Sequence, residues 1–339
     1  MSASWRPWGP LDWMIGKMPD VRWGVIGSFN TEDRCSATLS SLAADRVHHR
    51  RFLRILDPDM PITEPFAKRQ AAMRRALVEA GCDDDAFVDA RLLAPIDVMR
   101  AQLDGFLEAS GENVILDITA MPKRWFFLLV KLLSRNAGVR NLLATYASAE
   151  SYGRTLSSNP EPLRALPGFG SDDARLEHET AIVGVGFEPL GLNDLYSQHK
   201  IDKVRYLFPF PPGPPGFHRN WRFVRSLERL ILNRDAVQDD RWHIDMYDCS
   251  ATFEALLKVT RNGEATSVLA PYGPKTTSLA MCLFANAVEV AGHPQVPVYY
   301  AQPKRYDIGY STGVKTVGGR ADIQSYCIKI DGRTLYGVN

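Results

Sequence analysis

The sequence has few cysteines, and they form no pattern. Five cysteines occur in 339 residues, and none stands in a C-x-x-C pair or at the Cys/His spacing of a zinc site. Scattered cysteines in odd number are typical of reduced thiols inside a cell, and they argue against a disulfide scaffold and a zinc centre.

Long apolar runs and an excess of one charge are also missing. No apolar run approaches the ~20 residues that a bilayer-spanning helix needs. The first residues, MSASWRPWGPLDWM, contain two prolines that interrupt any signal-peptide core. Forty basic and 39 acidic residues leave a net charge of +1, so the total indicates neither a membrane nor a duplex nucleic acid as partner. We therefore expect a cytoplasmic protein.

The best-known catalytic and cofactor motifs are absent as well. The sequence contains no G-x-S-x-G, no G-x-x-x-x-G-K-[ST] and no complete G-x-G-x-x-G, and its seven histidines are not spaced for a metal. P-loop hydrolysis and dinucleotide oxidoreduction are weakly supported for this reason. We expect neither a metal nor a cofactor.

What is present is a regular alternation of strands and helices. From residue 22 onward, short apolar runs that predict buried strands alternate with helical spacing, and glycines or prolines separate them. After a loop rich in Pro, Gly, Ser and Asp at 157–173, the same order of elements resumes. Strands that alternate with helices of this length favour an α/β fold with mostly parallel sheets.

The two halves also share motifs in register. Pro122-Lys123 and Pro274-Lys275 each open a helix after a buried strand, 152 residues apart (275 − 123). Tyr146 and Tyr300 both stand in a Y-A-x4-Y spacing, at an offset of 154. We predict two tandem Rossmann-like lobes related by internal duplication. The expected ranges are 1–170 for the first lobe with its N-terminal extension, 171–313 for the second, and 314–339 for a C-terminal hairpin appendage around Asp331-Gly332.

The two helix starts are the leading candidates for chemistry. A lysine near the positive end of a helix dipole is locally unfavourable, and a bound anion compensates for it. In parallel sheets ligands bind beyond the carboxyl ends of the strands, where helix N-termini present free N–H groups. A tolerated, exposed lysine is the competing interpretation for each site.

Glycines and tyrosines at other strand ends extend this set. Glycine lets a backbone approach a ligand closely, although a tight turn needs it equally, and a strand-end tyrosine either stacks a base or packs in the core. The predicted ligand-binding residues are Gly27, Ser28, Asp117, Thr119, Lys123, Arg124, Tyr146, Gly186, Lys275, Thr276, Thr277, Tyr300 and Lys304.

Two further segments carry open alternatives. The stretch from Phe208 to Phe223 is rich in proline and aromatic residues, and it is either a lid or partner-binding loop or a rigid turn. The tryptophans Trp5, Trp8 and Trp13 dock a partner or pack on the protein's own sheet.

The segment DITAMPK (Asp117–Lys123) resembles the strand-to-helix segment of CRISPR-associated Rossmann-fold (CARF) domains. The family places an acidic residue and a Thr or Ser at a strand end, then a lysine that opens the helix lining a pocket for cyclic oligoadenylates. The resemblance implies a cyclic or linear oligonucleotide ligand and a role in antiviral defence. It also implies that two lobes in one chain mimic the family's homodimer. An effector domain of the kind such proteins commonly carry is not visible in the sequence.

Three functions are compatible with these features. The first is a sensor that binds a phosphorylated nucleotide and reports to a protein effector. The second is a metal-independent phosphodiesterase, in which Lys123 and Lys275 stabilise developing charge and Thr119 or Thr276 positions the attacking group. The third is a structural subunit whose helix starts are blocked by its own side chains. A carboxylate cluster formed by Asp57, Asp97 and Asp117 would instead favour metal-assisted chemistry.

Overall fold

The computed structural model describes residues 5–58, 62–171, 177–210, 220–226 and 238–338. The chain forms two compact units. Unit 1 contains Met1–Asn159 and Lys304–Leu335, and unit 2 contains Pro160–Pro303 and Tyr336–Asn339. These ranges differ from the predicted lobes, because the chain returns to unit 1 after Pro303. The chain passes from unit 1 to unit 2 within strand β8 (Ser157–Pro160), and it returns to unit 1 within strand β15 (Pro303–Tyr306).

Unit 1 is built on a mixed sheet with the order β1-β19-β6-β5-β2-β3-β4. Its strands from β4 to β6 are parallel, and β19 and β1 are antiparallel additions. The order third-second-first-fourth-fifth along the parallel part is that of Rossmann folds. The strands are β1 (Trp8–Pro10), β2 (Trp23–Phe29), β3 (Val47–Leu56), β4 (Phe87–Arg91), β5 (Asn113–Asp117), β6 (Asn141–Ala147) and β19 (Ile323–Ile330).

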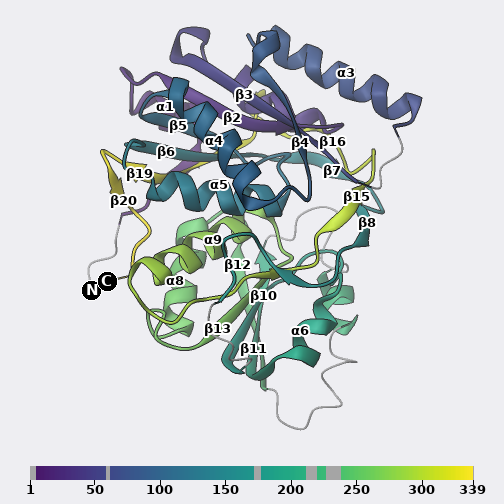
Figure 1. Ribbon diagram of the computed structural model, residues 1–339, viewed down its shortest axis with the longest axis vertical. Coiled ribbons are helices and arrows are strands. Elements are labelled where there is room, and N and C mark those ends of the chain that lie inside the picture. The colour runs from purple at the N-terminus through teal and green to yellow at the C-terminus, as the bar shows by residue number, and fades with distance from the viewer. Residues whose placement is uncertain (1–4, 59–61, 172–176, 211–219, 227–237, 339) are drawn as a thin grey trace. The chain divides into compact units, whose positions relative to one another are not determined.

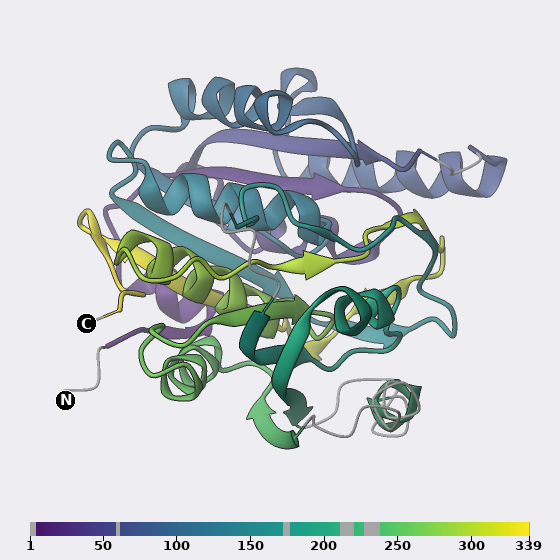
Figure 2. The ribbon, with the colours of Figure 1, turned by 60° about the horizontal axis from the view of Figure 1, so that its bottom comes forward.

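Three long helices of unit 1 agree with the sequence pattern. They are α3 (Glu64–Glu79), α4 (Ile96–Ser110) and α5 (Lys123–Arg135). Helix α3 contacts β2 and lies at the upper right of Figure 1 and the right of Figure 2, and only Phe66 and Leu77 of its side chains are buried. The small helix α1 (Leu11–Gly16) adds Leu11, Met14 and Ile15 to the core of the sheet.

The spacing of residues 31–45 predicts a helix after β2, and this prediction is wrong. The segment TEDRCSATLSSLAAD instead forms the 3-10 turns η1 (Asp33–Ser36) and η2 (Ala44–Arg46) around a four-residue helix, α2 (Ala37–Ser40). The Asn30 side chain accepts a hydrogen bond from the Glu32 N–H at 2.7 Å, and the Arg34 guanidinium donates to the Ala147 carbonyl at 2.8 Å. Side-chain bonds of this kind compete with regular helical bonding. A third 3-10 turn, η3 (Asp84–Ala86), precedes β4.

The C-terminal hairpin belongs to unit 1. Strands β19 and β20 (Arg333–Thr334) pair across Asp331 and Gly332, whose φ angles of 48° and 79° fit a type I′ turn, the hairpin turn that an Asp-Gly pair favours. Strand β19 pairs with β6 on one side and β1 on the other. The segment is therefore part of the main sheet of unit 1. This corrects the expectation that it forms a separate appendage. Smaller pairings join β7 (Ala149–Tyr152) to β16 (Ser311–Val314), and β17 (Thr316–Val317) to β18 (Arg320–Ala321).

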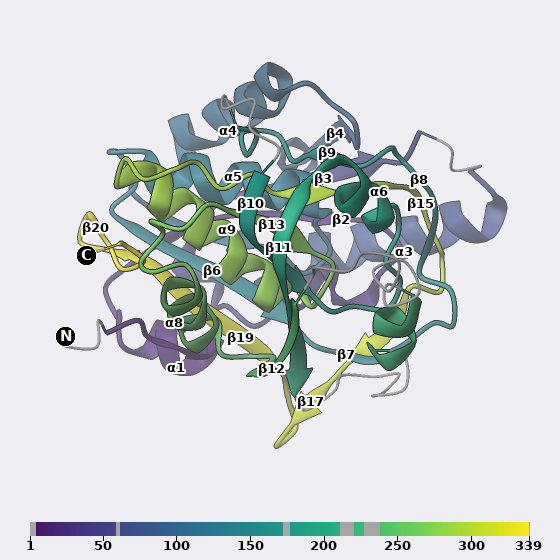
Figure 3. The same ribbon diagram turned by 90° about the horizontal axis from the view of Figure 1, so that it is seen from below.

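Unit 2 contains a parallel sheet with the order β12-β11-β10-β13, and Figure 3 shows β10, β11 and β13 side by side. A parallel bridge from Leu269 to Val298 continues this order. The strands are β9 (Arg164–Ala165), β10 (Glu177–Gly184), β11 (Lys200–Phe210), β12 (Gln238–Asp245), β13 (Ser267–Pro271) and β14 (Tyr299–Tyr300). The helices are α6 (Leu192–Gln198), α8 (Cys249–Val259) and α9 (Lys275–Val290), and residues 220–226 are also helical. Residues 211–219 of the predicted Phe208–Phe223 loop lie outside the described residues.

The two units thus share one strand order, and the protein has an α/β fold with mostly parallel sheets. The predicted internal duplication stays a prediction. In unit 1 the fifth strand, β6, is seven residues long, whereas one bridge stands in its place in unit 2. Helices α5 and α9 begin at Lys123 and Lys275 as expected, with Pro122 and Pro274 as N-caps. Among the described residues, no helix has the length and apolar character needed to span a bilayer.

Candidate functional site

The candidate site lies at the carboxyl ends of β2 and β5 in unit 1. Strand β2 is the first parallel strand, and the chain builds the sheet outward from it in both directions, so β2 and β5 border the topological switch point where such folds bind ligands. Ile26 of β2 pairs with Leu116 of β5. Asp117 ends β5 and is 3% exposed, and Thr119 follows it and is 0% exposed. Lys123, the first residue of α5, is 9% exposed.

The segment between β5 and α5 is held by a chain of hydrogen bonds. The Asp117 carboxylate accepts from the Thr119 N–H at 2.9 Å. The Thr119 hydroxyl oxygen accepts from the Ala147 N–H at 2.9 Å, and the Ile118 N–H donates to the Thr145 carbonyl at 3.0 Å. These contacts fix the backbone that leads to the start of α5, so Asp117 and Thr119 act as structural supports of the site's wall.

Ser28, near the end of β2, has a buried hydroxyl without a hydrogen-bond partner. Its side chain is 4% exposed. A Cβ on Gly24 would lie 2.5 Å from Cβ of Ser110, the last residue of α4, so that Gly24 faces α4. Side chains alternate along a strand, so Ser28 faces the same side as Gly24. Helix α5 contacts α4, and the Ser28 hydroxyl therefore stands on the face that carries the start of α5.

A buried ion pair closes the other face of this edge. Arg34 is 1% exposed, forms an ion pair with Glu32, and lies 5.6 Å from the ring centroids of Tyr146 and Tyr152. The Ser311 hydroxyl donates to Glu32 at 2.7 Å. Burial opposes the charge of Arg34, but the neighbouring Glu32 carboxylate raises the guanidinium pKa above its ordinary value. The pair joins the loop after β2 to the strand β16.

Tyrosines from distant parts of the chain meet beside this pair. The hydroxyls of Tyr146 and Tyr152 are 2.8 Å apart, and Tyr152 packs edge-on against Tyr310 with ring centroids 6.1 Å apart. Tyr310 in turn packs edge-on against Tyr306 at 5.9 Å. Tyr146 and Tyr306 thus belong to unit 1 and Tyr300 to unit 2, so the second Y-A-x4-Y spacing is divided between the units.

The titratable groups here do not form an activated nucleophile. Burial raises the pKa of the Cys35 thiol, and the Glu32 and Asp117 carboxylates raise it further, so the thiol stays protonated. Burial also raises the pKa of Tyr152, with a further contribution from Tyr146. The site offers hydrogen-bond donors and a helix start, which suit the binding of an anion.

The corresponding edge of unit 2 is packed by its own backbone. A Cβ on Gly186 would lie 1.9 Å from the Tyr272 carbonyl oxygen, so Gly186 serves a backbone contact within the unit. The Tyr272 hydroxyl donates to the Leu190 carbonyl at 2.6 Å, and the Thr276 hydroxyl donates to the Met246 carbonyl. Thr277, one residue further along α9, has a buried hydroxyl without a partner and is 1% exposed.

Several residues that the sequence predicts to bind a ligand make packing contacts or hydrogen bonds within the protein. Gly27 leaves room for the Phe52 ring, which a Cβ would approach to 2.9 Å, and Arg124 donates to the Ala94 carbonyl at 3.1 Å. Tyr300 lies beside Tyr272 in unit 2, with ring centroids 5.1 Å apart. Lys275 and Lys304 are partly buried. The structure therefore gathers Ser28, Asp117, Thr119, Lys123 and Tyr146 at unit 1, and Gly186, Lys275, Thr276, Thr277 and Tyr300 at unit 2.

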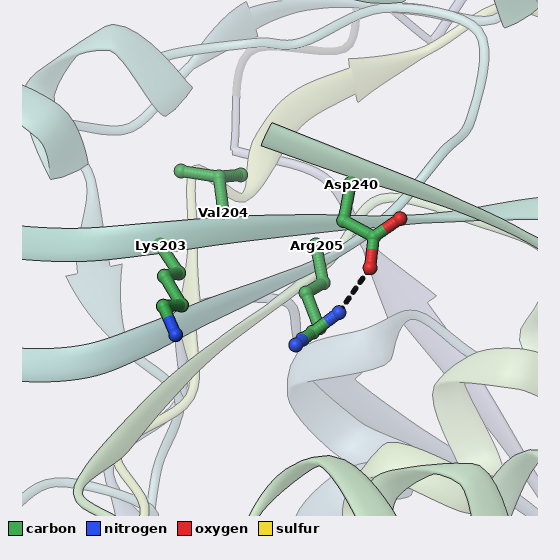
Figure 4. A pocket seen from close by; sticks show the side chains of 4 residues that line it. All are labelled: Lys203, Val204, Arg205 and Asp240. Atoms are coloured by element: carbon green, nitrogen blue, oxygen red, sulfur yellow. Dashed lines mark hydrogen bonds and ion pairs between the residues drawn. The ribbon is translucent and has the colours of Figure 1, made fainter. Parts of the chain in front are cut away.

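A shallow pocket elsewhere in unit 2 has different chemistry. Its volume is about 180 Å³ with open solvent included. Lys203, Val204, Arg205 and Asp240 line it, as Figure 4 shows. Arg205 pairs with Asp240 and stacks on Trp242, 5.1 Å from the ring centroid. The pocket lies in the amino half of β11, away from the carboxyl edge of the sheet, and its arginine is already neutralised.

Glu32, Arg34 and Ser311 are not among the site residues predicted from the sequence. Their signal was weak, because two of them fall in a segment with helical spacing and the third lies far along the chain. Among the described residues, no group of three or more His, Cys, Asp or Glu side chains is arranged to hold a metal ion. Asp57, Asp97 and Asp117 do not form the cluster that metal-assisted chemistry would require.

No protein-family model matches the chain, and no curated protein matches it. Among solved structures, one similar to the chain is the crystal structure of an N-terminal ketoreductase from a macrolactin assembly line, with 9% identity and a TM-score of 0.20. The match covers 76% of this chain and 57% of that structure, so the chain spans less than two thirds of its length.

Proposed function

We propose that the protein binds a phosphate-bearing nucleotide at the carboxyl edge of unit 1 and acts as a sensor. The observation that carries this proposal is the buried, unpartnered hydroxyl of Ser28 on the face where α5 begins. Leaving a buried hydroxyl without a hydrogen bond costs about 1–3 kcal/mol, and a ligand oxygen removes that cost.

The start of α5 supplies the charge complement. The N-terminus of a 13-residue helix carries partial positive charge, and Lys123 is its first residue. A phosphate at this point gains hydrogen bonds from backbone N–H groups and the attraction of the lysine. Thr277 repeats one part of the arrangement in unit 2, as a buried hydroxyl in the first turn of α9.

We also propose the chemical class of the ligand. The resemblance of Asp117–Lys123 to CARF domains supports a cyclic or linear oligonucleotide messenger, a protein effector as partner, and a role in antiviral defence. The Thr119 hydroxyl oxygen accepts from the Ala147 N–H and the Thr276 hydroxyl donates to the Met246 carbonyl, and these bonds favour binding over metal-independent phosphodiester cleavage.

The structural subunit is a second candidate, and two contacts in unit 2 favour it. In unit 2 the Gly186–Tyr272 contact and the Thr276–Met246 hydrogen bond fill part of the edge with the protein's own atoms. This candidate predicts that no nucleotide binds.

A thermal-shift screen against mononucleotides, dinucleotides and cyclic oligonucleotides tests the proposal, with the recovered nucleotide analysed for cleavage. We expect one class to raise the melting temperature by several degrees. Lys123→Met should weaken that binding by about 1.5–3 kcal/mol through loss of a charge-assisted hydrogen bond. The same change at an exposed position, Lys68→Met, is the matched control and should bind normally.

Ser28→Ala gives the sharper test, because its two effects have opposite signs. Removal of an unpartnered hydroxyl should keep or raise the stability of the free protein, and it should weaken nucleotide binding. Unchanged affinity in both Ser28→Ala and Lys123→Met would contradict the proposed site. Cleaved nucleotide in the recovered sample would identify an enzyme instead of a sensor.

A further inference from the structure

Strand β4 forms one edge of the main sheet of unit 1. It pairs with β3 on one side, and no other strand of the described residues pairs with it. Proteins commonly block such an edge with proline, lysine or a bulge, because its backbone groups can pair with another chain. The sequence of β4, FVDAR, contains neither proline nor lysine, and its register against β3 is continuous. The central residue, Asp89, has a side chain that is 58% exposed.

The direction of the backbone groups follows from one bond at the end of the strand. The Leu92 N–H donates to the Leu56 carbonyl of β3 at 3.1 Å. Backbone groups of successive residues in a strand point to opposite sides, so the even-numbered residues of β4 direct theirs to β3. Phe87, Asp89 and Arg91 therefore direct their N–H and C=O groups away from β3, toward the open edge.

Two of these outward groups are already bonded within the chain. The Phe87 N–H donates to the Asp84 carbonyl, and the Arg91 carbonyl accepts from the Trp125 indole N–H at 3.2 Å. The groups that remain are the N–H of Asp89 and of Arg91 and the C=O of Phe87 and of Asp89. The open edge thus offers two donors and two acceptors.

These donors and acceptors match those of an identical strand. In an antiparallel pair centred on Asp89, the two Asp89 residues exchange both of their bonds, and each Arg91 N–H donates to the Phe87 carbonyl of the other copy. Every remaining group is then used, and the two groups left out are those already bonded within the chain. A register shifted by two residues, centred on Ala90, would instead direct the Asp89 N–H at the Arg91 carbonyl that Trp125 occupies.

The side chains of β4 also suit this pairing. The Arg54 guanidinium donates to both carboxylate oxygens of Asp89, with Nε at 2.6 Å, so the two carboxylates that meet at the centre are each paired with a cation. Arg91 is exposed and stands diagonal to Asp89 of the other copy, where opposite charges attract. On the other face, the partly buried Val88 lies opposite Ala90, so apolar side chains meet there.

We propose that β4 is a dimer interface, at which the strand pairs antiparallel with β4 of a second copy of this chain. The two unit 1 sheets then form one continuous sheet across a twofold axis. The pairing is self-complementary and closed, so it produces a dimer and no longer assembly. This inference goes beyond the proposed function and does not depend on ligand binding.

Sedimentation of the full-length protein over a dilution series tests the proposal. We expect the wild type to dimerise. Asp89→Pro removes an N–H that points away from β3, and it should weaken the dimer about tenfold or more because two hydrogen bonds across the axis are lost. Asp89→Asn is the matched control, since it removes the same charge and keeps the N–H, and it should dimerise. A far-ultraviolet spectrum shared by the two variants would show that the fold persists.

Disulfide trapping tests the register with variants that keep the backbone N–H. The Cα atoms of a hydrogen-bonded antiparallel pair lie about 5.5 Å apart, within disulfide range, so Asp89→Cys should cross-link two copies under mild oxidation. Ala90→Cys is the control and should not, because its counterpart is offset by two residues along the strands. The five native cysteines are buried.

Three outcomes would overturn the proposal. The first is a wild type that stays monomeric at every concentration, which would leave the edge to an extended segment of a different protein. The second is a dimer that Asp89→Pro does not weaken, which would place the interface on another surface. The third is cross-linking of Ala90→Cys in place of Asp89→Cys, which would contradict the pairing centred on Asp89.

Discussion

The parallel sheets of units 1 and 2 have the same strand order, but different contacts line the carboxyl ends of their strands. In unit 1 a buried ion pair, a tyrosine cluster and the unpartnered Ser28 hydroxyl surround the carboxyl ends of β2 and β5. In unit 2 the loops after β10 and β13 press their backbones together at Gly186 and Tyr272. The comparison teaches that the same topology supports a polar edge in one unit and a close-packed edge in the other.

The largest effect is expected from the ion pair of unit 1. Arg34→Met leaves the buried Glu32 carboxylate without its cation, and we expect a loss of about 3–5 kcal/mol in the free energy of unfolding. Chemical denaturation followed by circular dichroism measures it. Arg34→Met combined with Glu32→Gln should recover part of the loss. A loss below about 1 kcal/mol would show that the pair is not what distinguishes unit 1.

The close-packed edge of unit 2 should respond most to added volume. Gly186→Ala places a methyl group against the rigid Tyr272 backbone, and we expect a loss of about 3 kcal/mol or more. Gly27→Ala in unit 1 meets the edge of the Phe52 ring, which can shift, so its loss should be about 1–3 kcal/mol. The two melting curves test the comparison directly. Equal losses would mean that the two edges are packed alike.

Asp57 gives unit 1 a distinctive pH dependence. Its pKa is about 6 in the folded protein against 3.8 as the ordinary value, so the folded state holds more protons between these values, and stability should fall as the pH rises from about 4 to 6. Asp57→Asn should remove this fall and add about 1–2 kcal/mol at pH 7. Unfolding measured at a series of pH values checks the sign. A variant less stable than the wild type at pH 7 would contradict it.

Unit 2 should show the opposite sign, with the smallest effect. His178 and His199 are both buried, with ring nitrogens 3.1 Å apart, and burial lowers the pKa of His199. The folded state binds fewer protons than the unfolded one, so stability should fall as the pH drops below about 6.5. His199→Gln should flatten this dependence. An unchanged acid limb in the variant would assign the effect to other groups.

The sequence was informative where structure is local. The starts of α5 and α9 at Lys123 and Lys275 and the turn at Asp331-Gly332 follow from caps, periodicity and turn residues. The helix expected after β2 was wrong, because Arg34 bonds to Ala147 more than a hundred residues away. The helix propensity of a short segment gives no information about a hydrogen bond to a residue so distant in the sequence.

The candidate site was predicted in part for the same reason. Ser28, Asp117, Thr119 and Lys123 stand at strand ends and a helix start that the alternation of elements places at one edge. Tyr306 and Ser311 come to unit 1 only because the chain returns after Pro303, and no pattern near them indicates that return. The hydrogen bonds and ring contacts that join distant parts of the chain at the site therefore could not be predicted from local sequence patterns.

The position of β19 between β6 and β1 has a consequence for biosynthesis. Strand β6 leaves the ribosome long before β19, because the segment Pro160–Pro303 of unit 2 is translated between them. During that interval β6 presents an unpaired edge that can join another chain. Unit 1 completes its sheet only after translation of β19, so nascent chains that stall within unit 2 should be prone to aggregation and dependent on chaperones.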